Sequence, residues 1–234
     1  MEVQSNFPDI MFDMDINSNP ILSSPNSEYS IQFRQTKESF VDIELYKQFL
    51  DNAISRFRHS RTYKHYKGYL IDLGLNRCQL LPNINTEMDI TIEMHHNFLT
   101  IYDIALMICE HVLNTVGSIT TFELVMLLKE EHKNNRVPIV MLSKTAHQMF
   151  HNNEMVIPAQ ACFGFWSELL IKYYRGITKD IANKTILFLN KSLEIEKNNL
   201  EHNEVLLKLR DHVLSWSNYN EYAELPKLNY IMNY

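Results

Sequence analysis

The sequence predicts an α+β protein that is mostly helical, and three patterns lead to that class. Hydrophobic residues recur at helical spacing over most of the 234 residues. Residues 89–94 instead alternate strictly between polar and apolar side chains, and residues 137–142 form a short apolar run, as strands do. A hydrophobic fraction of 45% is ordinary for a globular protein with a substantial core.

The N-terminal part of the chain is predicted to hold an arm and two helices. Residues 1–36 are polar, acidic and interrupted by proline, and we interpret them as an extended arm that orders against a partner. Helices are expected over residues 41–57 and 60–73. Ser60 caps the second of them, and Gly74 ends it.

The remaining elements follow from alternation, capping residues and apolar spacing. They are a short strand near residues 78–81, the main strand over 89–94, helices from Thr100 to Gly117 and from Thr120 to His132, a strand over 137–142, a helix capped by Ser143, and helices over 165–175 and 179–212.

These patterns divide the chain into four predicted regions. They are an acidic arm (1–36), a helical region with basic and aromatic residues (37–77), a central region (78–158) with a helical insertion (100–133), and a C-terminal helical region (159–234).

Composition argues against several function classes. With 5 Gly and no Walker or dinucleotide-binding motif, a nucleotide-driven motor or dinucleotide enzyme is not expected. The 3 Cys are dispersed, which is typical of reduced thiols in the cytoplasm. No secretory signal and no apolar run of about 18 residues is present, so we expect a cytoplasmic protein without membrane contact.

The net charge of −6 is unlike that of a typical nucleic-acid-binding protein, but a local basic cluster stands out. Its cations could grip a phosphate backbone, with tyrosine rings stacking on unpaired bases. The alternative is a solvated helix pair whose tyrosines belong to the core. The predicted DNA-binding residues are Arg56, Arg58, Arg61, Lys64, Lys67 and, further along the chain, Lys144.

Four histidines form the candidate site. His147 and His151 are four residues apart on a predicted helix, so one helix can offer two imidazoles to one cation. His95 and His96 are adjacent at the end of the main strand. If the strand ends there, one ring can face a metal ion while its neighbour faces a water.

The order strand, His-His, strand, His-x-x-x-His helix resembles the HNH (ββα-metal, His-Me finger) endonuclease family, particularly its colicin-type DNases. The resemblance covers roughly residues 78–155. It implies a small ββα-metal unit with helical additions before, within and after it, and hydrolysis or nicking of DNA by a phage or mobile-element protein. His95, His147 and His151 would hold one divalent ion (Mg, Mn, Ni or Zn), and His96 would be the general base.

The alternative is a non-catalytic subunit of a phage structural, replication or transcription assembly that keeps this fold. The acidic charge and the long tails favour it, as does Pro138, which stands where the HNH family has a central Asn. Other proteins would then bind through the N-terminal arm and the C-terminal helices. A third interpretation is a helical interaction module whose histidines are ordinary polar residues.

Overall fold

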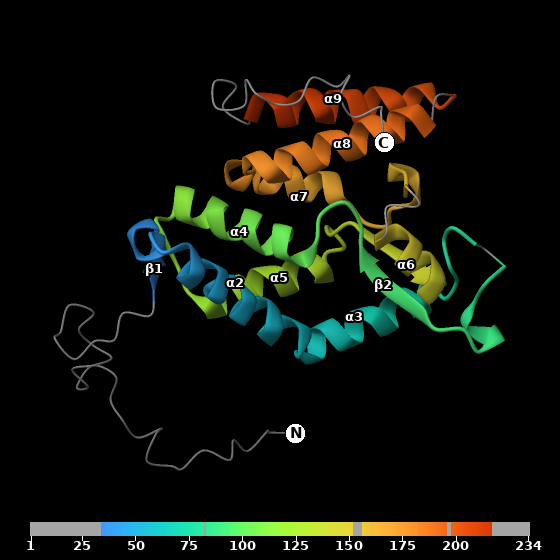
Figure 1. Cartoon of the computed structure of the whole chain (residues 1–234), viewed down its shortest axis with the longest axis horizontal. Helices are drawn as coiled ribbons and strands as arrows, with labels where there is room; N and C mark the ends of the chain where they lie inside the picture. The colour runs from blue at the N-terminus through green and yellow to red at the C-terminus, as the bar shows by residue number, and fades with distance from the viewer. Residues whose placement is uncertain (1–33, 82, 152–155, 196–197, 217–234) are drawn as a thin grey trace, which may run out of the picture.

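The computed structural model describes residues 34–81, 83–151, 156–195 and 198–216 (Figure 1). The described part is mostly helical and contains two antiparallel sheets of two strands each. The mostly helical α+β class is therefore confirmed.

Besides the expected helices and the strands that contain His95 and follow Pro138, the chain forms two strands of two residues each and several short 3-10 helices (η), which the sequence does not predict. In chain order, the described elements are β1 (Gln35–Thr36), η2 (Lys37–Phe40), α2 (Ile43–Arg58), α3 (Arg61–Asp72), η3 (Thr86–Met88), β2 (Ile92–His96), α4 (Ile101–Thr115), β3 (Ser118–Ile119), α5 (Thr121–Lys133), β4 (Ile139–Ser143), α6 (Lys144–His151), η4 (Ala159–Ala161), α7 (Trp166–Lys172), η5 (Tyr174–Gly176), α8 (Lys179–Ile195) and α9 (Leu200–Trp216).

Local capping chemistry sets the helix boundaries that the sequence predicts. The Ser60 side chain accepts a hydrogen bond from the backbone of α3, and Thr100 and Thr120 each form a capping box, with Asp103 and Glu123 respectively. Gly74 and Gly117 end their helices in the left-handed region, at φ 87° and 88°.

The central sheet differs from the prediction in its boundaries. β2 pairs with β4 in antiparallel register, with Met94 opposite Met141, but it begins at Ile92 because its partner β4 ends opposite this residue, at Ser143, where α6 follows. The expected strand near residues 78–81 is not formed. Gln79 instead contacts β4 as a single residue, since both its backbone N–H and its side-chain oxygen bond the backbone of Met141.

The helices form layers on both sides of this sheet (Figure 1). α2 packs on α5 and α4, and α3 packs on α5; α9 is the outermost element and rests on α8. The buried side chains form one continuous core that runs from α2 to α9. The single helix expected over residues 179–212 is thus two helices, α8 and α9.

Ion pairs to two buried carboxylates connect the C-terminal helices to the rest of the molecule. The Lys184 ammonium on α8 lies 2.7 Å from the Asp103 carboxylate on α4. The fully buried Glu131 on α5 accepts from Arg136 at 2.5 Å, from Lys172 at 2.7 Å and from the Tyr173 hydroxyl at 2.7 Å. In the described part of the chain, every helix falls short of the length or apolarity of a membrane span.

Candidate functional site

The two adjacent histidines lie inside β2 and therefore point to opposite faces of the sheet. His95 is opposite Val140 and His96 is opposite Ile139, and both are buried. Consecutive strand side chains alternate between faces. His95 accordingly contacts α6, whereas His96 contacts α5.

On the α6 face, a carboxylate and two imidazoles form a chain of contacts. His147 Nδ1 lies 2.5 Å from a Glu93 carboxylate oxygen, and its Nε2 lies 2.9 Å from His95 Nδ1. The Phe150 ring packs against His95, with 4.7 Å between the ring centroids. A single tautomer assignment satisfies both contacts, with His147 donating to Glu93 and accepting from His95.

On the opposite face, His96 belongs to a separate buried pair. Its Nε2 lies 3.0 Å from His132 Nε2, and His132 Nδ1 lies 2.7 Å from the Leu128 carbonyl oxygen. The pair is enclosed by Phe57, Tyr63 and Tyr66, whose rings pack around His132.

Burial governs the protonation of this second pair. It lowers the pKa of His132 to about 4. Burial, followed by the neighbouring His132, also holds the pKa of His96 well below its usual range. Both rings are therefore neutral at pH 7.

The structure brings together part of the predicted ligand set. His95 and His147 meet, although they are 52 residues apart in the chain, and His96 lies on the other face of β2. His151 ends α6, but its side chain lies outside the described residues. Within residues 34–81, 83–150, 156–195 and 198–216, no group of three or more His, Cys, Asp or Glu is arranged to hold a metal ion.

Two members of these clusters were not predicted from the sequence. Glu93 lies two residues before His95, so the alternation of the strand already placed both side chains on one face. Strand alternation alone is therefore enough to place Glu93 beside His95. No sequence pattern places His132 beside His96, because only the packing of α5 against β2 brings the two together.

The predicted basic residues are accessible, whereas the neighbouring tyrosines are not free to stack on bases. Arg56, Arg58, Arg61, Lys64, Lys67 and Lys144 are all exposed. Tyr66 is buried and Tyr63 is half-buried, and both pack around His132. The tyrosines thus belong to the core, in agreement with the alternative interpretation of this stretch.

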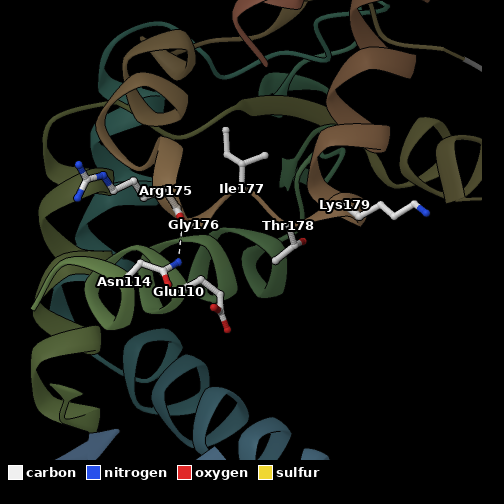
Figure 2. Close-up of a pocket in the computed structure, with 7 residues that line it drawn as sticks. All are labelled: Glu110, Asn114, Arg175, Gly176, Ile177, Thr178 and Lys179. Carbon is white, nitrogen blue, oxygen red and sulfur yellow. Dashed lines mark hydrogen bonds between the residues drawn. The ribbon is translucent and has the colours of Figure 1, made fainter. Parts of the chain in front are cut away.

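A pocket of about 410 Å³ lies elsewhere, between α4 and the segment from η5 to the start of α8 (Figure 2). Asn114 donates to the Arg175 carbonyl oxygen at its edge, and Glu110 accepts from the Tyr46 hydroxyl. The side chains of Arg175 and Lys179 extend away from the pocket in opposite directions. Polar groups therefore do not converge in it as they would around a charged ligand.

Comparison with known families identifies the class of this protein as a phage virion protein. The chain belongs to the bacteriophage G278-like virion protein family, whose model matches residues 5–220. No curated protein and no solved structure matches the chain.

The family match corrects the main functional interpretation of the sequence. The prediction of a metal-dependent HNH endonuclease is wrong, because the family that covers almost the whole chain is one of virion proteins. The prediction of a phage protein is confirmed. The match favours the structural alternative, and the comparisons give no support for an enzymatic activity.

Proposed function

We propose that this protein is a structural subunit of the phage particle that packs against other virion proteins. The observation that carries the proposal is the family match over residues 5–220, which spans both the N-terminal arm and the helical body. The architecture supports it, since the buried side chains of the described residues form one continuous core.

The outer surface of α9 is the contact region that we propose for assembly. α9 is the outermost element (Figure 1), and its Leu200, Val205 and Leu207 side chains are exposed. Leu200 is 79% exposed, and Leu207, two helical turns further on, lies on the same side of the helix. Charged residues lie between these positions, as in the mixed surface of a protein–protein interface.

Mass spectrometry of purified particles tests this proposal. Particles banded by density and treated with external protease should contain this chain at a constant ratio to the major capsid protein. A matched sample of the lysate supernatant controls for adsorbed protein. If the chain is abundant in infected cells but absent from intact particles, it is not a structural subunit.

A second candidate property is the binding of a transition-metal ion by His95 and His147, and the contact of His147 with Glu93 favours it. Metal-binding histidines usually donate their second ring N–H to a carboxylate, as His147 is placed to do. Two nitrogens that bind one cation at about 2.1 Å each are about 3.0 Å apart at the right angle of a square-planar ion such as Ni²⁺, and about 3.4 Å apart at the tetrahedral angle of Zn²⁺. His95 Nδ1 and His147 Nε2 are 2.9 Å apart. Imidazole ligands favour Zn²⁺ or Ni²⁺ over Mg²⁺ or Mn²⁺.

Titration calorimetry of the full chain with Zn²⁺ and with Ni²⁺ tests this property. We expect one ion per chain, no such binding in His147→Ala, and an affinity about tenfold lower in Glu93→Gln. The control is His65→Ala, which removes an exposed histidine on α3. If His147→Ala binds the ions as well as the wild type does, the His95–His147 contact is a hydrogen bond alone.

A further inference from the structure

One face of α5 leaves an apolar pair exposed to solvent. Phe122 is 72% exposed and Met126 is 46% exposed, and they lie one helical turn apart. The inward face of the same helix buries Leu124 and Leu128 completely. A phenylalanine exposed to this extent beside a second apolar side chain indicates a surface that another segment covers.

The N-terminal arm enters the body directly beside this surface. Arg34 is the first described residue, and its guanidinium donates to the Ser118 side chain at 2.9 Å and to the Glu123 carboxylate at 2.8 Å. Glu123 is the neighbour of Phe122 on α5. Because Gln35 pairs with Ile119, Arg34 lies at the start of α5, and 33 residues precede it in the chain.

The residues just before Arg34 have the chemistry that this surface requires. Tyr29, Ile31 and Phe33 alternate with polar residues, so an extended segment places the three on one side. Alternate residues of an extended segment are about 6.6 Å apart. Residues four apart on a helix, such as Phe122 and Met126, are separated by about 6 Å along its axis. The two spacings match.

We propose that residues 29–33 of the same chain run along α5, with Phe33 over Phe122 and Ile31 over Met126. The anchor at Arg34 favours this occupant over a second copy. A tethered segment meets its site at an effective concentration in the millimolar range, far above that of a free partner. This docking goes beyond the role in the particle and would hold in the isolated protein.

Disulfide trapping in the full chain tests the proposal. In the double variant Ile31→Cys/Met126→Cys, mild oxidation should produce a disulfide within one chain, seen as a faster band on a non-reducing gel. The matched control is Ile31→Cys/Leu200→Cys, which places the second thiol on α9. Its yield of the intrachain disulfide should be at least about tenfold lower. The single variants measure background from Cys162, since Cys78 and Cys109 are buried.

A dimer band that grows with protein concentration would mean that a second copy covers α5 and would overturn the proposal. Equal trapping in both pairs, or none in either, would overturn it as well. Hydrogen exchange gives a second measurement without new cysteines. Amides of residues 29–33 should exchange about tenfold faster in Phe122→Ser than in the wild type. Neither result depends on whether purified particles contain the chain.

Discussion

At the scale of single residues, the buried polar groups carry the largest energetic consequences. Glu131 has no exposed side-chain area, yet it is an anion surrounded by two cations and a tyrosine hydroxyl. Burial alone would raise its pKa, but the bonds from Arg136, Lys172 and Tyr173 hold the pKa of this carboxyl below its ordinary value. His96 and His132 show the opposite solution, since they are buried as neutral rings.

Removal of the Glu131 carboxylate should destabilise the fold. Glu131→Ala leaves the buried Tyr173 hydroxyl without its acceptor and leaves Arg136 and Lys172 only their pairing with the exposed Glu130, and we expect a loss of about 1–3 kcal/mol in the free energy of unfolding. The adjacent Glu130→Ala is the control, because Glu130 pairs with the same Arg136 and Lys172 but its side chain is 50% exposed. Its cost should stay below about 1 kcal/mol. Urea denaturation measures both, and equal losses would contradict this assignment.

The buried histidine pair predicts a pH dependence of stability. His132 titrates near 4 in the fold and near 6.5 when unfolded, so between these values the unfolded chain binds more protons. Stability should therefore fall as pH drops from about 6.5 towards 4, by about 3 kcal/mol for this residue.

Denaturation at pH 7, 6 and 5 measures this slope. His132→Gln keeps a hydrogen-bonding side chain that does not titrate, and it should flatten the curve. The exposed His65→Ala should leave the slope as in the wild type. An unchanged slope in His132→Gln would assign the pH dependence to other groups.

At the scale of elements, close packing of η5 against α4 requires a glycine. A Cβ at Gly176 would lie 1.8 Å from the Met107 carbonyl oxygen and 2.6 Å from the His111 backbone nitrogen, so a backbone shift would be unavoidable. We expect Gly176→Ala to lower the unfolding free energy by about 1–3 kcal/mol or more.

Gly68→Ala is the matched control for this substitution. Gly68 lies inside α3 with nothing within 4 Å of the added Cβ. Alanine there should raise stability by about 0.5–1 kcal/mol, because glycine is a poor helix former. Thermal unfolding followed by circular dichroism compares the two. A neutral Gly176→Ala would show that α4 and η5 are packed less closely than described.

The contact of the basic residues with DNA stays a prediction at this scale. Arg58, Arg61 and Lys64 are exposed at the junction of α2 and α3. If they bind phosphates, substituting all three with Ala should weaken binding to a DNA duplex about uniformly across sequences. The number of phosphate contacts given by the slope of log affinity against log salt concentration should fall by about three. Lys208→Ala, on α9, is the control. Fluorescence anisotropy at several salt concentrations measures both variants. If the triple variant binds as well as the wild type, these residues do not contact DNA.

At the scale of the whole molecule, the layered helical body presents α9 as its outer surface (Figure 1). Leu200→Ser and Val205→Ser together should leave the fold intact, because both side chains are exposed. They should reduce incorporation into particles about tenfold if α9 contacts a neighbour. The control is Glu201→Ser/Lys208→Ser on the same helix. The measurement is complementation of a phage that lacks the gene, followed by immunoblotting of purified particles. Normal incorporation would show that the interface lies elsewhere on the protein.

The sequence by itself determined the features that depend on near neighbours. Ser60, Thr100 and Thr120 cap their helices as predicted, because a cap involves groups within a few residues. The mostly helical class follows for the same reason. The alternation of β2 likewise places Glu93 and His95 on one face.

Only the tertiary structure decided how the histidines are divided. His147 comes to His95 across 52 residues, and His132 comes to His96 across 36, through the pairing of β2 with β4 and the packing of α5. The separation of His95 from His96 follows from their place inside β2 rather than after it. Long-range packing selects which side chains meet, and since burial then sets their charge, neither property can be derived from local spacing.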